Sequence, residues 1–218
     1  MNDDLETLVY MDHAATTPLR PAVLEDRLPY LKGSFGNPSS LYTLAQEARN
    51  AVDRSRRAIA KLIGIRSSEL TFTSGGTESD NAAIKGGAMA MRNLGRHIIT
   101  SSIEHHAVLH TCHQMEQFGF NVTYLPVDQD GLVSKSDLLD SVTSETVLVS
   151  IMMANNEIGT IQPISDLSES IRGISKEEER TILFHTDAVQ ALGHIPIDLS
   201  ELKAVHMMSM SAHKFYGP

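Results

Sequence analysis

Several residue types are scarce in this sequence, and each scarcity excludes a class of protein. One cysteine, Cys112, stands among 218 residues, so no intrachain disulfide can form and a reducing compartment, the cytoplasm, is expected. Lys and Arg number 18 against 27 Asp and Glu, which gives a formal net charge of −9. Nucleic-acid phosphates are bound by clustered cations, and we therefore expect no direct contact with nucleic acid.

Long apolar segments are scarce as well. No stretch approaches the roughly 20 apolar residues that a membrane-spanning helix needs. The acidic opening MNDDLETLVY lacks the basic and apolar regions of a secretory signal. We expect neither secretion nor a membrane partner. Hydrophobic residues still make up 41% of the chain and charged residues 21%, a composition typical of a globular domain with a real core.

The spacing of the apolar residues predicts an α/β fold. After an irregular start with a short helix near 21–32, positions 39–64 show the pattern of an amphipathic helix, capped by Ser39 or Ser40 and ended by Gly64. Short strands and helices then alternate, which favours βαβ units and a three-layer, mostly parallel sheet. Strands are expected at 70–74, 97–102, 121–127, 146–153, 181–187 and 204–210, and helices at 78–94, 106–119, 134–142 and 165–175.

Polar residues follow these strands, at the edge where an open parallel sheet binds its ligands. Gly76 and Thr77 stand in a Gly-Gly turn that opens a helix. Free N–H groups and the helix dipole favour a phosphate there, although such a pair is often only a tight turn. His105 begins the next helix, where its imidazole either contacts a flat ring and moves protons or is simply exposed to water.

The later strand ends carry amide, acidic and basic groups. Asn155 and Asn156 follow a wholly apolar strand, where they either bind a ligand hydroxyl or cap a turn. Asp187, with Gln190 three residues on, ends a buried strand and needs a cation, either a salt-bridge partner or a protonated ring nitrogen. Lys214 follows the last strand, and a dry site would change it from a solvated cation into a nucleophile toward an aldehyde.

Histidines at helical spacing raise the alternative of a metal site. His106, His110 and His113 recur every three or four residues and could share one helix face. No carboxylate with suitable spacing completes the set, and Cys112 points off that face. We expect no metal.

One ligand accounts for the residues at the strand ends. A phosphate, a flat ring, a basic ring nitrogen, a ring hydroxyl and an aldehyde are the groups of pyridoxal 5′-phosphate, whose protonated ring accepts electrons from a carbanion. The phosphate is assigned to Gly76, Thr77, Ser211 and His213, and the flat ring to His105. The ring nitrogen is assigned to Asp187, the ring hydroxyl to Asn156 and Gln190, and the aldehyde to Lys214.

A series of motifs runs along the chain: MDHAATTPLRP, GNPSS, TSGGTESDNAAIKG, EHHAVL, NNEIGTIQPI, HTDAVQALG and SAHKFYGP. In this order they resemble the motifs of the cysteine desulfurases, the NifS- and IscS-like branch of the class V aminotransferases, which have pyridoxal phosphate fold type I. The resemblance, from Val9 to Pro218, implies conversion of L-cysteine to L-alanine by a homodimer. Sulfur would pass as an enzyme-bound persulfide to an acceptor such as an iron–sulfur scaffold or a tRNA thiolation protein.

The resemblance also implies a role for each site residue. Lys214 would bind the cofactor's aldehyde and carry protons at the substrate, and His105 would stack on the ring and assist those transfers. The segment 14–17 would lie near the substrate entrance. The other cofactor contacts would be Asp187 at the ring nitrogen, Gln190 at the ring oxygen, Asn156 beside the substrate, and Gly76, Thr77, Ser211 and His213 at the phosphate.

The chain departs from the family pattern in two ways. Tyr42 stands where members often carry histidine. The family's nucleophilic cysteine and its substrate-binding arginine lie downstream of the lysine, and neither is present here. Cys112 precedes the lysine, in the middle of a helix, and is interpreted as a buried structural thiol.

We therefore expect the N-terminal half of a desulfurase, inactive by itself in sulfur transfer. Residues 1–20 would form an N-terminal segment and residues 21–218 a partial cofactor-binding large domain, incomplete at its C-terminus and without the small C-terminal domain. Two alternatives stay open: a selenocysteine lyase or other class V enzyme, and a non-catalytic chain that binds an intact desulfurase.

Overall fold

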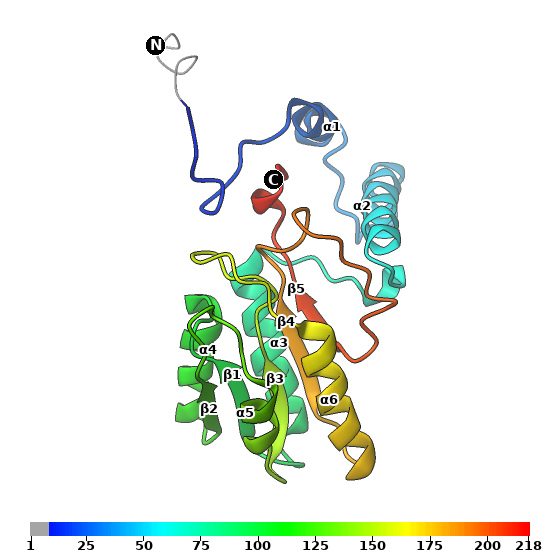
Figure 1. Ribbon diagram of the computed structural model, residues 1–218. Coiled ribbons are helices and arrows are strands. Elements are labelled where there is room, and N and C mark those ends of the chain that lie inside the picture. Colours follow the sequence, from blue (N-terminus) through cyan, green and yellow to red (C-terminus); the bar gives the residue numbers. More distant parts are fainter. Residues whose placement is uncertain (1–8) are drawn as a thin grey trace.

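The fold is built on one sheet of five parallel strands, seen in a computed structural model that describes residues 9–218 (Figure 1). The strand order is β2-β1-β3-β4-β5, and each neighbouring pair is parallel. The predicted parallel α/β fold is therefore confirmed. Part of the segment expected at 1–20 lies outside the described residues. The strands are β1 His97–Ser101, β2 Asn121–Leu125, β3 Thr146–Ser150, β4 Leu183–Asp187 and β5 Met207–Ser209.

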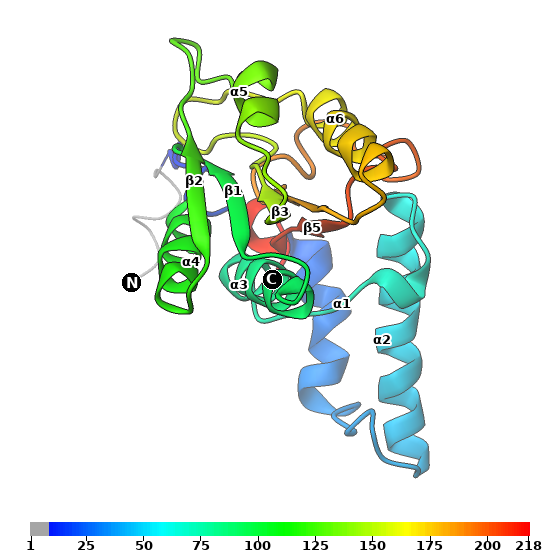
Figure 2. The same cartoon turned by 90° about the horizontal axis from the view of Figure 1, so that it is seen from below.

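Helices cover both faces of this sheet, so the fold has three layers (Figure 2). Each face buries its own apolar cluster, one centred on Phe184 and Leu167 and the other on Ile84 and Leu148. Strands buried on both faces are expected in a parallel sheet, which explains why β1 and β3 are apolar along most of their length. The helices are α3 Gly76–Met91 and α4 His106–Gln117 on one face, and α5 Lys135–Asp140 and α6 Ile164–Glu177 on the other.

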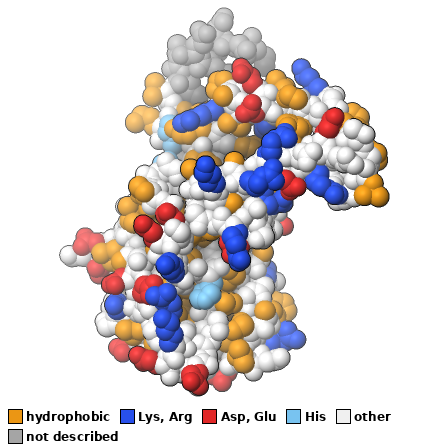
Figure 3. Space-filling view, turned by 90° about the vertical axis from the view of Figure 1, so that its right-hand side faces the viewer, with side chains coloured by type: hydrophobic (Ala, Val, Ile, Leu, Met, Phe, Trp, Pro, Cys, Tyr) orange, Lys and Arg blue, Asp and Glu red, His pale blue; other side chains and the backbone are white. Residues whose placement is uncertain are grey.

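Two further helices, α1 Pro21–Lys32 and α2 Thr43–Leu62, lie to one side of the sheet (Figures 1 and 2). Figure 3 shows this part projecting from the body, with hydrophobic and basic side chains on its surface. Helix α1 matches the helix predicted at 21–32. Short 3₁₀ turns, η1 Ser67–Glu69 and η2 Ala212–Lys214, complete the elements.

Helix α2 starts later than the apolar spacing suggests. Ser39 and Ser40 do not cap it: they lie in a turn, where the N–H of Ser40 donates to the carbonyl of Asn37 at 3.0 Å. The residue before the helix is Tyr42, in an extended conformation. The end of the helix is as predicted, because Gly64 adopts a φ of 75°, in the left-handed region that favours glycine.

The strand predicted at 70–74 is wrong. Leu70 is buried as an inward-facing strand residue would be, but these residues belong to no strand. A strand needs a neighbouring backbone to pair with, and within residues 9–218 this segment has no strand or bridge pairing. Among residues 9–218, no helix is both long enough and apolar enough to cross a membrane.

Candidate active site

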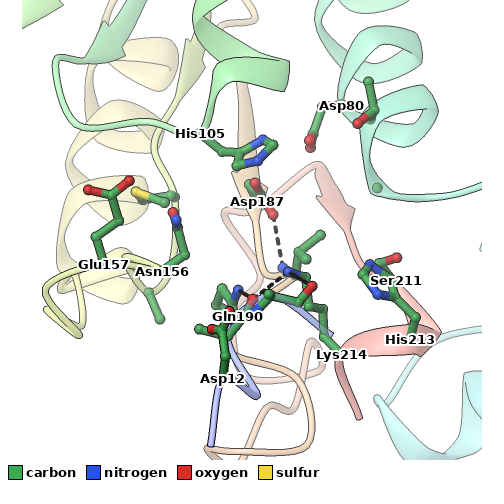
Figure 4. A pocket seen from close by; sticks show the side chains of 17 residues that line it. Asp12, Asp80, His105, Asn156, Glu157, Asp187, Gln190, Ser211, His213 and Lys214 are labelled. Atoms are coloured by element: carbon green, nitrogen blue, oxygen red, sulfur yellow. Dashed lines mark hydrogen bonds between the residues drawn. The ribbon is translucent and has the colours of Figure 1, made fainter. Parts of the chain in front are cut away.

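The carboxyl ends of the strands open into one cavity of about 490 Å³ (Figure 4). All nine residues that the sequence assigns to the cofactor line this cavity, together with parts of the N-terminal segment. Asp187 ends β4, and the others stand in loops or helix starts that come after a strand or after residues 70–74. The nine are Gly76, Thr77, His105, Asn156, Asp187, Gln190, Ser211, His213 and Lys214.

Lys214 lies in η2, a few residues after β5, and its ammonium group faces the N-terminal segment. Its Nζ donates to the carbonyl oxygens of Ala14 at 2.5 Å and Ala15 at 2.9 Å. Partial burial lowers the pKa of Lys214 from its ordinary value, while the negative charges of Asp12 and Asp187 act in the opposite direction. A lowered pKa increases the share of neutral amine, which is the nucleophilic form.

Asp187 is the last residue of β4 and is 5% exposed. Its Oδ1 accepts a hydrogen bond from the N–H of Val189 at 2.9 Å, and it forms no ion pair within residues 9–218. Burial raises the pKa of Asp187, whereas the Val189 N–H, His105 and Lys214 pull it back toward the charged form. A buried carboxylate with spare acceptor capacity facing a cavity is suited to a cationic ligand atom.

His105 is the residue that precedes α4, and its ring lies next to Asp187 in the cavity (Figure 4). Its Nδ1 accepts a hydrogen bond from the N–H of Ala107 at 3.1 Å. The imidazole therefore caps the helix through one nitrogen and keeps Nε2 for chemistry. The side chain is exposed and also lines the cavity, so contact with a ligand ring and simple exposure to water both stay open for this residue.

The two asparagines after β3 have different environments. Asn155 is buried, donates from Nδ2 to the carbonyl of Ile103 at 2.9 Å and accepts from the N–H groups of Glu157 and Ile158 at 2.8 and 3.0 Å. Its amide is thus used to hold the loop. Asn156 lines the cavity, and its side chain is the one available to a ligand.

Gln190 lines the cavity, but its amide is already engaged. Its Nε2 donates to the carbonyl oxygen of Ala14 at 2.7 Å, which leaves the amide oxygen as the group that a ligand could meet. The sequence gives no sign of this contact, because the two residues are 176 positions apart.

A polar corner is formed by Gly76 and Thr77 at the start of α3 together with Ser211 and His213. The first N–H groups of a helix have no partner within the helix, so they present donors and a positive dipole end to the cavity. A Cβ built on Gly76 would lie 3.5 Å from the Cβ of Ser211, which measures how closely the two segments approach. The Nδ1 of His213 lies 3.0 Å from the hydroxyl of Thr16.

The cavity also contains acidic residues that the sequence analysis missed: Asp12, Asp80 and Glu157. Asp80 is 1% exposed and lies on the buried face of α3, one turn before Ile84 and two turns before Gly87 and Ala88. An acidic residue in register with the apolar face of a helix is the signal that could have identified it.

The histidines of α4 do not form a metal site with their neighbours. The rings of His106 and His110 stack with centroids 5.1 Å apart, and His113 interacts with Glu116 and Tyr124 instead. Across the described residues, no group of three or more His, Cys, Asp or Glu side chains is arranged to hold a metal ion.

Comparisons with known proteins agree on one family. The model of the aminotransferase class-V family matches residues 9–218. A curated relative, cysteine desulfurase IscS of Dictyoglomus turgidum, is 56% identical over 210 residues, which cover 96% of this chain and 52% of the relative.

Solved structures of similar proteins have the same fold. One described as SspA in complex with cysteine superposes with a TM-score of 0.89 at 42% identity, covering 97% of this chain and 59% of the other. A NifS-like protein gives a TM-score of 0.90 at 43% identity, with 96% and 56% covered. The chain spans about half the length of the curated relatives it matches.

Proposed function

Because the chain belongs to the aminotransferase class V family, we propose that it forms the cofactor-binding part of a cysteine desulfurase. The cofactor of this family is pyridoxal 5′-phosphate. The proposed reaction converts L-cysteine to L-alanine and passes the sulfur to an acceptor. The observation that carries the proposal is the convergence of Lys214, Asp187 and His105 on one cavity, although they stand at or after the ends of three different strands.

The residues present fit this cofactor. A buried carboxylate without a cationic partner in the described chain, Asp187, suits a protonated ring nitrogen. The helix start at Gly76 and Thr77, with the Ser211 hydroxyl and His213 beside it, suits a phosphate. Lys214 supplies the only side-chain amine that lines the cavity among residues 9–218, and it would hold the aldehyde.

The remaining side chains would bind and orient the reactants. When bound, pyridoxal 5′-phosphate supplies a ring that withdraws electrons from the substrate's α-carbon. His105 would lie against the ring and assist proton transfer, with Nε2–H as the donor that faces the reactants, because Nδ1 accepts from the N–H of Ala107. Asn156 and the amide oxygen of Gln190 would form hydrogen bonds with hydroxyl groups of the cofactor or substrate. Lys214 would carry protons at the substrate's α- and γ-positions.

Sulfur transfer needs a reactive thiol, and Cys112 is unsuited to the task. It is fully buried, and burial raises its pKa to about 12, so the nucleophilic thiolate is scarce at neutral pH. The sulfur-accepting thiol must therefore come from another source. The same observation favours the second candidate function, a chain that binds the cofactor without transferring sulfur by itself.

Three further properties belong to this proposal. The relative described in complex with cysteine supports L-cysteine as the substrate. The proposed acceptor is an iron–sulfur scaffold, which the name IscS of the relatives suggests, or a tRNA thiolation protein. Homodimerisation is supported by exposed apolar side chains in and between the N-terminal segment, α1 and α2. The exposed apolar side chains that support a dimer include Val9, Met11, Leu24, Leu31, Phe35 and Leu41.

A cytoplasmic location is supported by the single, reduced cysteine.

Borohydride trapping tests the proposal. Pyridoxal 5′-phosphate added to the purified chain is expected to give a visible absorption band, and reduction should fix a pyridoxyl group on Lys214, identified by peptide mass spectrometry. Lys214→Ala should abolish the band and the label. Lys203→Ala, an exposed lysine outside the cavity, is the matched control and should keep both. Labelling spread over several lysines, with Lys214 not preferred, would contradict the proposal.

A further inference from the structure

Two buried carboxyl groups share the deep part of the cavity. Asp80 comes from α3 and Asp187 from the end of β4, and both side chains line the cavity (Figure 4). Burial is the main reason why the pKa of Asp80 rises to about 8, and the charge of Asp187 is the second. Asp80 and Asp187 are 1% and 5% exposed, and two buried carboxylates that repel each other disfavour the doubly charged state, so the pair retains one proton at neutral pH.

The surroundings of the two groups differ, and the difference decides where that proton lies. Asp187 accepts a hydrogen bond from the N–H of Val189 and lies near His105 and Lys214, all of which favour its charged form. Oδ1 of Asp80 has no hydrogen-bond partner in the part of the chain that the structure describes, and the Ser209 hydroxyl is the one group that favours the charged form of Asp80. The anion is therefore better stabilised on Asp187.

His185 lies nearest to Asp80 but does not provide a positive charge. Its Nε2 lies 3.7 Å from Oδ1 of Asp80. The ring is fully buried, and burial lowers the pKa of His185 to about 4, so the ring is neutral at pH 7. Its two nitrogens are within hydrogen-bond distance of the hydroxyls of Ser150 and Ser209, at 2.9 and 3.0 Å.

The other buried carboxyl group nearby, Glu104, does not compensate Asp80 either. It receives hydrogen bonds from Ser101 and from the N–H of Met152 at 2.6 and 2.8 Å, and burial raises its pKa to about 8. The groups that face Asp80 are thus the Ser209 hydroxyl, a neutral imidazole and two carboxyls, while Lys214 and His105 act on Asp187.

We propose that Asp80 is a positioning residue for Asp187: its carboxyl group keeps the proton of the pair, so that Asp187 alone carries the negative charge. This rests on the proposed function, because that charge is the one that would meet the protonated ring nitrogen of pyridoxal 5′-phosphate. A neutral Asp80 confines the charge to the oxygen atoms at the end of β4. A neutral Asp80 also means that no second carboxylate competes with Asp187 for the protonated ring nitrogen.

Carboxyl-carbon NMR of the cofactor-free chain, with ¹³C-labelled aspartate and a pH titration, tests the proposal. The Asp80 signal should report a protonated group at pH 7 and titrate near pH 8. Asp187→Asn should lower the pKa of Asp80 by about one unit or more, because it removes the neighbouring negative charge. Asp80→Asn should leave the pKa of Asp187 nearly unchanged, because Asp80 is already neutral while Asp187 ionises. Asp80 ionised at pH 6, or a clear fall in the pKa of Asp187 in Asp80→Asn, would overturn the proposal.

Asp166→Asn is the control. It removes the charge of an exposed carboxyl on α6, so the Asp80 titration should stay in place. If Asp80→Asn does not fold, the Asp187→Asn titration still tests whether the charge of Asp187 raises the pKa of Asp80. Borohydride trapping on Lys214 in the wild-type chain separates the outcomes. Trapping with an acidic, uncoupled Asp80 refutes this inference alone, and coupled carboxyls without trapping refute the proposed function alone.

Discussion

Gln190 and Lys214 donate hydrogen bonds to the same acceptor, the carbonyl oxygen of Ala14, at 2.7 and 2.5 Å. One atom of the N-terminal segment thus ties together residues that follow β4 and β5. The hydroxyl of Thr17 adds a donor bond to the carbonyl of His213 at 2.9 Å and accepts from the N–H of Tyr216 at 2.6 Å. The wall of the cavity is therefore made by two chain segments that depend on each other.

Removing one donor should loosen the N-terminal segment. Gln190→Ala leaves Ala14 bonded to Lys214 only, and a lost hydrogen bond of about 1 kcal/mol corresponds to roughly fivefold faster opening. The amide of Thr17, which donates to the carbonyl of His213, should exchange with deuterium faster by about that factor. Gln117→Ala, on the exposed end of α4, should leave the exchange unchanged. Equal rates in wild type and Gln190→Ala would show that the shared acceptor does not hold the segment.

Two adjacent glycines should respond differently to substitution. A Cβ on Gly76 would come within 2.9 Å of Cγ2 of Val189, whereas a Cβ on Gly75 would meet nothing within 4 Å. Gly76→Ala should push the start of α3 away from the cavity and weaken binding of pyridoxal 5′-phosphate about tenfold, or about 1.4 kcal/mol. Gly75→Ala should bind nearly as the wild type does. Absorbance titration measures both, and equal losses in the two variants would argue against a phosphate at this corner.

Glu104 should make the stability of the cofactor-free chain depend on pH. Its pKa is about 8 in the fold against an ordinary 4.5, so between these values the folded state binds more protons than the unfolded state. The free energy of unfolding must then fall as pH rises, by up to about 1.4 kcal/mol per pH unit for one group.

Glu104→Gln keeps an oxygen to accept from Ser101 and from Met152 N–H but has no charge to gain. Denaturant unfolding measured at intervals from about pH 5 to pH 8 should therefore show a flatter decline in the variant. Asp166→Asn, at an exposed site on α6, serves as the control and should follow the wild-type curve. A variant curve parallel to the wild type would contradict the raised pKa.

Cys112 should be inert while the chain is folded. A thiol reagent added to the native protein should label it no faster than the chain unfolds, because the side chain is fully buried and its pKa is about 12. Cys112→Ala should still allow borohydride trapping on Lys214, at a stability cost of about 1–2 kcal/mol for the small cavity it leaves. Rapid, stoichiometric labelling of the native chain would refute this prediction.

The regular part of the fold and the composition of the site follow from the sequence alone. Apolar periodicity predicts the five strands that form the sheet, and the rule that ligands bind at their carboxyl ends predicts which polar residues meet. Lys214 and Gly76 are far apart in the chain, yet both line one cavity, because parallel strands bring their ends to the same edge.

Features that depend on a contact with a distant part of the chain could not be predicted from the sequence. Residues 70–74 have strand composition, but pairing depends on a neighbouring backbone. The separate uses of Asn155 and Asn156 depend on which amide reaches the carbonyl of Ile103. Asp80 is a similar case. The sequence shows that it lies on the apolar face of α3, but its proximity to Asp187 arises only when the helix packs against the sheet.

The bonds between Thr17 and His213 join residues 196 positions apart, and this distance has a consequence for how the molecule is made. Bringing the ends of such a chain together costs about 5 kcal/mol of configurational entropy, and the sheet and its helices lie within that loop. The pocket should therefore form late, after the βαβ units have docked. Substitutions confined to residues 14–17 should therefore leave the circular dichroism spectrum and the cooperative thermal unfolding almost unaltered. The amine of Lys214 would nevertheless lose its alignment in the cavity.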